Sequence, residues 1–204
     1  MSSISYAITT HNEGKSIQTL INTVMGCMHP EDELVIVDDY SSDEETKRIL
    51  SGYDFVTKHK FKKNYADHKN FLNSLCIKNY IFQIDGDELP TPQLIKFIKA
   101  LVKSRDDIDL YWVPRENKLH NMDMEYIKMW NWVVDGQRRV NYPDYQGRVY
   151  KNKPHIEWSR EVHEIITGHQ TQLILPKNSN VDILHHRDME HQIRSNKFYH
   201  ENFK

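Results

Sequence analysis

Three short polar segments carry the residue types best suited to hold a cation or a phosphate group. They are residues 9–13 (TTHNE), 38–42 (DDYSS) and 85–88 (DGDE). Carboxylate oxygens are preferred ligands of Mg²⁺ and Mn²⁺, so acidic segments of this kind predict a cation site. In the last segment only Gly86 separates two carboxylates, which would let a cation lie close to the backbone and bridge the oxygens of a diphosphate.

Each of these segments also has a purely structural interpretation. Residues 38–42 are equally typical of a turn that leads into a helix, and residues 10–13 match a capping box. An Asp-x-Asp triplet is common by chance. The combination is more specific, because each segment directly follows an apolar run.

Alternating strands and helices are expected to position the three segments. Apolar runs predict strands at residues 4–9, 33–38, 53–57, 79–84 and 109–114. Helical spacing and capping residues predict helices at 15–27, 42–50, 67–78 and from Thr91 to about residue 102. This order predicts an α/β fold with a mostly parallel sheet covered on both faces. Ligands of such sheets bind at the carboxyl ends of the strands, where the polar segments fall.

The second half of the chain is less regular. Residues 115–160 are rich in aromatic and charged side chains, and their periodicity is weak. Strands are predicted at 146–151, 173–175 and 181–185, and a terminal helix from Asp188 to the end. With no internal repeat and no linker, residues 1–204 are interpreted as one domain.

The composition excludes several classes of protein. The 204 residues are 38% hydrophobic and 27% charged, which predicts a globular chain, and the net charge of −2 argues against a general nucleic-acid binder. Cys27 and Cys76 form no disulfide framework, and no signal peptide or apolar run near the length of a membrane span is present. A cytoplasmic protein is therefore expected, with peripheral membrane contact as an option. The seven glycines lie too far apart for a GxGxxG fingerprint or a P-loop.

In their order and spacing, the three segments resemble the nucleotide-sugar-binding half of family 2 glycosyltransferases, which have the GT-A fold. The acidic pair follows the second strand, and the DGD triplet lies about 45 residues later. Residues 64–70 (NYADHKN) are similar to the segment before the DxD strand in these enzymes. This resemblance covers residues 3–114. A weaker one, in residues 147–152 (GRVYKN), 156–158 (IEW) and 162–164 (VHE), is to members of the lipopolysaccharide-core type.

The resemblance implies an inverting, metal-dependent glycosyltransferase with a Rossmann-like sheet and an irregular acceptor-side portion. Residues 1–114 would bind a nucleotide-diphosphate sugar, most simply a UDP-sugar, and residues 115–204 would face a glycan, lipid or protein acceptor. Mn²⁺ or Mg²⁺ would be the cofactor. Rival interpretations are a sugar nucleotidyltransferase, a non-catalytic nucleotide- or glycan-binding module, and a metal phosphohydrolase. The sequence lacks the glycine-rich basic loop of a sugar nucleotidyltransferase. It also lacks the histidine clusters that would accompany the acids of a metal phosphohydrolase.

On the donor side, the resemblance implies a role for each matching residue. Thr9 and either Asn12 or Glu13 would line the nucleotide pocket, and Asp39 would accept a hydrogen bond from the base. Lys69 and Asn70 would lie near the ribose and diphosphate, and Asp85 against the ribose or the sugar. Gly86 would be part of the same nucleotide-sugar-binding site. Asp87 would bind the metal together with Asp85.

On the acceptor side, the resemblance implies a carboxylate that deprotonates the acceptor hydroxyl, for which Glu164 is the first candidate and Glu161 the second. His163 would hold a phosphate or an acceptor group, or would serve only as a structural histidine. His185 is a candidate extra metal ligand, and because strand residues alternate, its neighbour His186 would then face away.

Residues 126–139 could form an aromatic and basic acceptor platform. In the alternative interpretation, the tryptophans pack in the core and the arginines lie on a solvated face. The segment contains Trp130, Trp132, Arg138 and Arg139. Arg138 and Arg139 follow Gln137 without a tryptophan, so the QxxRW-like motif is missing. We therefore expect no processive polysaccharide synthase.

Overall fold

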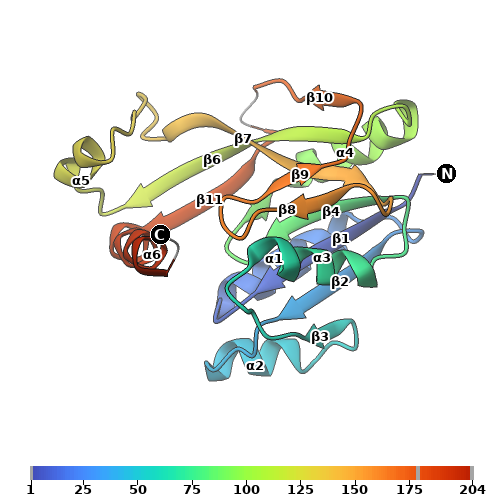
Figure 1. Cartoon of the computed structure of the whole chain (residues 1–204), viewed down its shortest axis with the longest axis horizontal. Helices are drawn as coiled ribbons and strands as arrows, with labels where there is room; N and C mark the ends of the chain where they lie inside the picture. The colour runs from blue at the N-terminus through green and yellow to red at the C-terminus, as the bar shows by residue number, and fades with distance from the viewer. Residues whose placement is uncertain (1, 178–179, 203–204) are drawn as a thin grey trace.

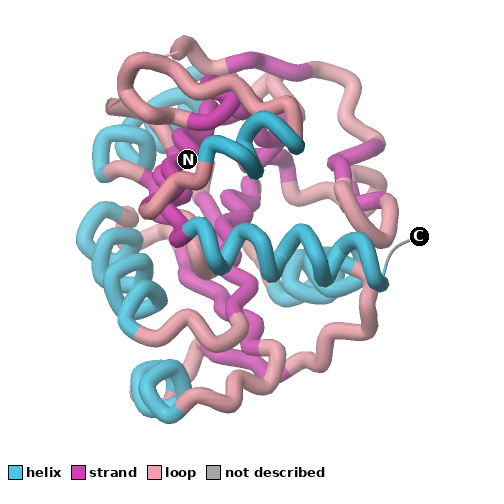
Figure 2. The backbone as a smooth tube through the Cα atoms, turned by 90° about the vertical axis from the view of Figure 1, so that its left-hand side faces the viewer, coloured by secondary structure: helices cyan, strands magenta, loops and turns pink. Residues whose placement is uncertain are grey.

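Within residues 2–177 and 180–202, which the computed structural model describes, a central sheet of nine strands has helices on both faces (Figure 1 and Figure 2). The strands are β1 Ile4–Thr10, β2 Glu33–Asp38, β3 Val56–Lys58, β4 Tyr80–Asp85, β5 Leu89–Pro90, β6 Leu110–His120, β7 Val140–Lys151, β10 Gln172–Ile174 and β11 Ile183–Asp188, beside a separate hairpin of β8 Glu157–Ser159 and β9 Ile165–Thr167. The helices are α1 Lys15–Cys27, α2 Glu44–Leu50, α3 Tyr65–Leu75, α4 Pro92–Ser104, α5 Met124–Met129 and α6 Met189–Asn202.

The strand order is β3-β2-β1-β4-β7-β6-β11-β5, and β10 pairs with β6 outside this path. Strands β1 to β4 run parallel to one another, whereas β7 is antiparallel to both β4 and β6. The expected mostly parallel α/β sheet is therefore confirmed. The register pairs Thr9 of β1 with Val37 of β2 and Asp85 of β4, so the carboxyl ends of these strands meet at one edge.

Alternation along β1 builds the two sides of the core. Ile4, Tyr6 and Ile8 are fully buried with the apolar faces of α1 and α4, whereas Ala7 packs on the opposite side with residues of α3 and the β8–β9 hairpin. A strand whose side chains are buried on both faces reads as a continuous apolar run. This explains why β1, β2 and β4 are recognisable in the sequence.

Helix starts follow local capping chemistry, with one exception. Thr91 caps α4 by accepting a hydrogen bond from the backbone of Leu94, as predicted. Asp43, and not Ser42, caps α2 through the backbone N–H of Thr46. Helix α1 follows Gly14 without any side-chain cap, so the interpretation of residues 10–13 as a capping box was wrong.

The second half of the chain departs most from expectation. Strands β6 and β7 form a long antiparallel pair that extends the predicted strands 109–114 and 146–151 by six residues each in the direction of the loop between them. The β8–β9 hairpin, β5 and α5 were not predicted. The terminal helix begins at Met189, and residues 203–204 of its predicted range lie outside the described residues.

Each helix within residues 2–177 and 180–202 is too short or too polar to span a lipid bilayer.

Candidate active site

Two cavities lie against each other at the carboxyl edge of the parallel strands. The first, here called the strand-end cavity, has a volume of about 600 Å³ and is lined by the ends of β1, β2 and β4 and by residues of α3 and α6. The second, the β6–β7 cavity, has a volume of about 550 Å³ and is lined by residues of those two strands and of the β8–β9 hairpin. The residues that line both are Asp85, Asp87, Glu164, Arg187 and Tyr199.

Asp85 lies at this shared border between two cations. Lys69 Nζ is 3.2 Å from its Oδ1, and Arg148 Nη2 is 2.6 Å from its Oδ2. Gln83 and Thr9 donate further hydrogen bonds to Oδ1, at 2.8 and 3.2 Å. Burial alone would raise the pKa of Asp85, but Arg148 and Lys69 outweigh it and hold this pKa well below its usual range. The carboxylate is therefore charged at neutral pH.

Asp87 is held from the other side by β11. Its Oδ2 accepts a hydrogen bond from Arg187 Nε at 2.8 Å and lies 3.3 Å from His185 Nε2. Burial again raises the pKa of this carboxyl, but the contacts with His185 and Arg187 bring it below the usual range. His186 turns away, as the alternation along a strand predicted, and its Nε2 lies 3.1 Å from Glu116 Oε1.

The donor atoms of Asp87 and His185 fit a divalent cation. His185 Nδ1 lies 2.7 Å from Asn117 Oδ1, and because an amide oxygen only accepts, this ring nitrogen donates. Nε2, on the side of the Asp87 carboxylate, is then the ring nitrogen that would bind a cation, as in histidines that bind metals. No group of three or more histidine, cysteine or acidic side chains with metal-binding geometry occurs in the described ranges, so further ligands would come from substrate or water.

Gly86 packs directly against the end of β1. A Cβ atom at this position would lie 2.9 Å from Glu13 Cγ, 3.0 Å from Thr10 Oγ1 and 3.1 Å from the backbone oxygen of Thr9. Contacts this short leave no room for a side chain, which is the structural reason for glycine between the two acids.

We expect Gly86→Ala to lower the free energy of unfolding by about 1–3 kcal/mol, the usual cost of overpacking a tight site. Urea unfolding measures this change. The matched control is Gly26→Ala in α1, where no atom lies within 4 Å of the added Cβ, and which should leave stability unchanged or slightly higher. A Gly86→Ala protein as stable as the control would contradict the packing described here.

Glu13 also lines the strand-end cavity, but unlike Asp85 and Asp87 it has a raised pKa. Burial, followed by the charge of Asp87, raises the pKa of its carboxyl to about 8. Glu13 therefore carries a proton at neutral pH and can donate a hydrogen bond into the cavity.

Thr9, Asp39 and Lys69 line the strand-end cavity as well. The Oδ1 atom of Asp39 accepts a hydrogen bond from the backbone of Phe61 at 2.8 Å, which fixes the carboxylate at the end of β2. The preceding Asp38 is buried and binds the backbone and hydroxyl of Ser41. In residues 38–42, Asp38 therefore stabilises the turn, and Asp39 lines the cavity.

Asn12 and Asn70 lie outside the residues that line either cavity. Asn12 Oδ1 accepts from the backbone N–H groups of Ser42 and Asp43, at 2.7 and 3.0 Å, and so ties β1 to the start of α2. Asn70 exchanges two hydrogen bonds of 2.9 Å with the backbone of Trp158, and so ties α3 to β8. Both side chains support the site and face other protein groups.

Glu164 reaches the shared border from the loop between β8 and β9. Its Oε1 lies 2.6 Å from Lys69 Nζ, and Lys69 also lies over the ring of Trp158. His163 lines the β6–β7 cavity, with its ring 6.2 Å from that of Tyr199. Glu161 is exposed and lines neither cavity, although its backbone oxygen accepts a hydrogen bond from Tyr65.

Sequence reasoning missed three arginines and one acid that line the β6–β7 cavity: Arg115, Arg148, Arg187 and Asp144. Arg148 binds both Asp85 and the fully buried side chain of Glu88, and Arg115 binds Glu88 and Asp144. These pairs depend on β7 lying antiparallel to β4 and β6, and that pairing has no local signal in the sequence. The one hint in the sequence was the segment 147–152 (GRVYKN), which contains Arg148 and is part of the weaker family resemblance.

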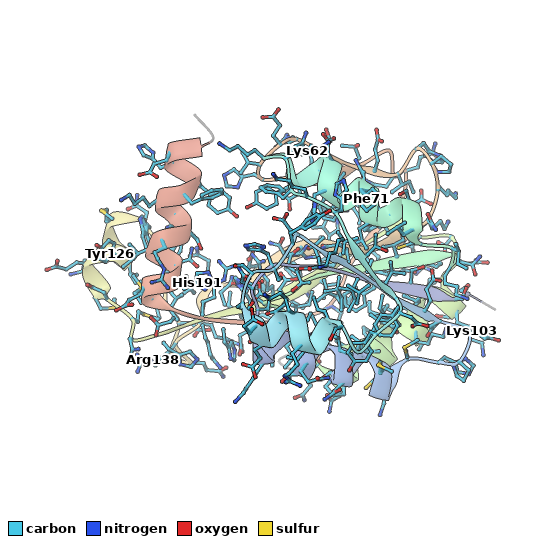
Figure 3. All side chains as sticks on the ribbon, turned by 90° about the horizontal axis from the view of Figure 1, so that it is seen from below. Lys62, Phe71, Lys103, Tyr126, Arg138 and His191 are labelled. Carbon is cyan, nitrogen blue, oxygen red and sulfur yellow. The ribbon has the colours of Figure 1, made fainter. Side chains whose placement is uncertain are left out.

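The aromatic segment 126–139 contributes to the site through one residue. Tyr126, Trp130 and Trp132 all pack against a small apolar cluster that contains Leu119 and Ile127, and Trp132 also lines the β6–β7 cavity. Figure 3 shows Tyr126 at one end of the molecule, on the side of α6 away from α3. The core interpretation therefore fits Trp130, and the platform interpretation is open only for Trp132.

The sequence matches a known family over most of its length. The family model described as "Glycosyl transferase family 2" covers residues 5–160. The chain belongs to glycosyltransferase family 2. The chain is 32% identical over 106 residues to an uncharacterized glycosyltransferase of Rickettsia felis, an alignment that covers 52% of this chain and 36% of the relative. It is 36% identical over 59 residues to the poly-beta-1,6-N-acetyl-D-glucosamine synthase of Staphylococcus epidermidis, covering 29% and 14% of the two chains.

Solved structures support a GT-A fold for the chain. The structure of S. aureus TarS 1–349 in complex with UDP-GlcNAc superimposes with a TM-score of 0.63 at 14% identity, over 91% of this chain and 58% of that chain. The chain thus spans little more than a third of the length of the Rickettsia relative and over half of the TarS chain.

Proposed function

We propose that the chain is an inverting, metal-dependent glycosyltransferase that moves a sugar from a UDP-sugar to an acceptor hydroxyl. The observation that carries this proposal is the shared border of the two cavities. Acids from strand ends, Asp85 and Asp87, and a carboxylate from the second half of the chain, Glu164, line both cavities there. A donor in one cavity and an acceptor in the other would meet at these side chains.

The strand-end cavity is the proposed donor site. Asp39 would accept a hydrogen bond from the base with the carboxylate oxygen that Phe61 leaves available, and Thr9 and the protonated Glu13 would complete the wall. Asp85 would lie against the ribose or the sugar, with Lys69 beside it. A uridine donor is favoured by the shared fold with TarS, which binds UDP-GlcNAc.

Asp87 and His185 are the proposed cation ligands, for Mn²⁺ or Mg²⁺. When bound, the cation would neutralise the charge that develops on the departing nucleoside diphosphate. Arg187 now holds the Asp87 oxygen that faces His185, so it competes with a cation for this atom. Arg187 would keep the carboxylate in position whenever the site holds no cation.

The β6–β7 cavity is the proposed acceptor site. Its cations are already paired with carboxylates, Arg115 with Asp144 and Arg148 with Asp85, and its wall includes Trp112, Trp132 and Tyr145. Paired charges and aromatic rings suit a neutral, hydroxyl-rich molecule such as a glycan. Glu164 would remove the proton of the acceptor hydroxyl. The hydroxyl oxygen would then bond to the anomeric carbon of the donor sugar as the bond from that carbon to the diphosphate breaks.

A thermal-shift screen of nucleotides and nucleotide sugars, with and without Mn²⁺, tests this function. At about a hundred times Kd, a ligand that binds only the folded chain should raise Tm by about 5–10 °C. We expect UDP and a UDP-sugar to do so in the presence of Mn²⁺, and GDP, ADP and CMP to have smaller effects. If no uridine nucleotide raises Tm under any metal condition, the proposed function is wrong.

A further inference from the structure

One side of α6 forms a wall of the strand-end cavity. The residues of the helix that line it are His191, Arg194, Ser195, Phe198 and Tyr199. They recur at steps of three and four residues, which places them on one face of the helix. Figure 3 shows α6 across from α3, with His191 labelled on the side of the helix toward the rest of the molecule.

Helix α6 is fixed near both of its ends. Met189 and Ile193, near its start, pack in the apolar cluster of Leu119 and Ile127. Toward its other end, the ring of Tyr199 lies 6.1 Å from that of Tyr65 at the start of α3. The helix can therefore hold a side chain in its middle at a defined place opposite the strand ends.

Arg194 differs from the other long cations that line the strand-end cavity. Lys69 is paired with Asp85 and Glu164, and Arg187 is paired with Asp87. Arg194 makes no hydrogen bond or ion pair with any residue in the ranges 2–177 and 180–202, and the carboxylate of Asp188 acts on it only at longer range. A guanidinium has a planar set of N–H donors that matches the oxygens of a phosphate group.

We propose that Arg194 binds the diphosphate of the nucleotide donor, with His191, one turn earlier on the same face, adding a hydrogen bond to it. The inference rests on the proposed function, because it takes the strand-end cavity as the donor site. Lys69 and Arg187 are occupied by carboxylates, so Arg194 is the cation that can meet the phosphate oxygens without first breaking an ion pair. Helix α6 is then part of the donor site and forms one wall of it.

Calorimetric titration of the full chain with UDP and with uridine, both in Mn²⁺, separates phosphate recognition from base and ribose recognition. We expect Arg194→Gln to weaken UDP binding by about tenfold or more, the effect of removing a charge-assisted contact, and to leave uridine affinity unchanged. Uridine affinity, if weak, is measured by competition in ligand-observed NMR. The matched control is Lys197→Gln on the same helix, an exposed cation that lines neither cavity and should change neither affinity.

Two results would overturn the inference: unchanged UDP affinity in Arg194→Gln, or equal losses for UDP and uridine. The second would mean that the side chain supports the helix and does not contact phosphate. Failure of the proposed function has a different signature, since the unsubstituted protein would then fail to bind UDP in the first titration.

Discussion

Replacing Asp87 by alanine is expected to remove most of the dependence of UDP affinity on Mn²⁺. In the unsubstituted protein we expect Mn²⁺ to tighten UDP binding by at least about tenfold. Loss of a residue that only supports a metal ligand already lowers metal affinity or activity by about tenfold, so removal of the metal itself should have at least that effect. The Asp87 carboxylate is mostly buried, and its Oδ2 faces His185 and Arg187. Without it, His185 alone cannot hold the cation, and the UDP affinity measured with Mn²⁺ should fall to the value measured with a chelator.

The fold should survive this substitution, because Asp87 belongs to the cavity wall and not to the apolar core. Asp107→Ala is the matched control, since Asp107 is an exposed acid that is paired with Arg105 and lines neither cavity. An Asp87→Ala protein that keeps the full effect of Mn²⁺ on UDP affinity would show that the cation binds elsewhere.

Replacing Glu164 by glutamine is expected to lower turnover by about 10² to 10⁴, the usual cost of losing a general base. Glutamine keeps the size of the side chain and can still accept a hydrogen bond from Lys69. UDP affinity should therefore change little. Turnover is measured as UDP release from the nucleotide sugar that the unsubstituted protein consumes.

Glu161→Gln is the control for this experiment, because Glu161 is exposed and lines neither cavity. It should release UDP at nearly the normal rate. Loss of turnover in Glu161→Gln with normal turnover in Glu164→Gln would reverse the assignment. Normal rates in both variants would mean that the base is another carboxylate of the β6–β7 cavity, of which Asp144 is the next to replace.

The first half of the fold was predictable because its elements are local. Each buried parallel strand is a short apolar run, and α4 carries its own cap at Thr91. Parallel strands also bring their carboxyl ends together, so the meeting of Thr9 with Asp85 followed once the strands were recognised. The second half was not predictable in the same way. The later part of β6, which carries Asn117, is defined by its pairing with the distant strands β7 and β11.

The candidate site shows the same division between local and distant information. The acids of the strand ends were found from their types and positions, but their partners, Arg148 and Arg187, come from residues 60 to 100 positions away. For Asn12 and Asn70, the sequence indicated a role in ligand binding, whereas the structure shows both side chains bound to backbone groups. An asparagine can bind a ligand or satisfy backbone groups equally well, and only the turn of the chain around each side chain decides between them.

The central claim is that acids at the ends of the parallel strands and a cation together hold the diphosphate of a uridine nucleotide. Calorimetric titration of the unsubstituted protein with UDP, in Mn²⁺ and in excess chelator, tests it most directly. The account predicts binding that is tighter by about tenfold or more with Mn²⁺. Equal UDP affinity under the two conditions would contradict it.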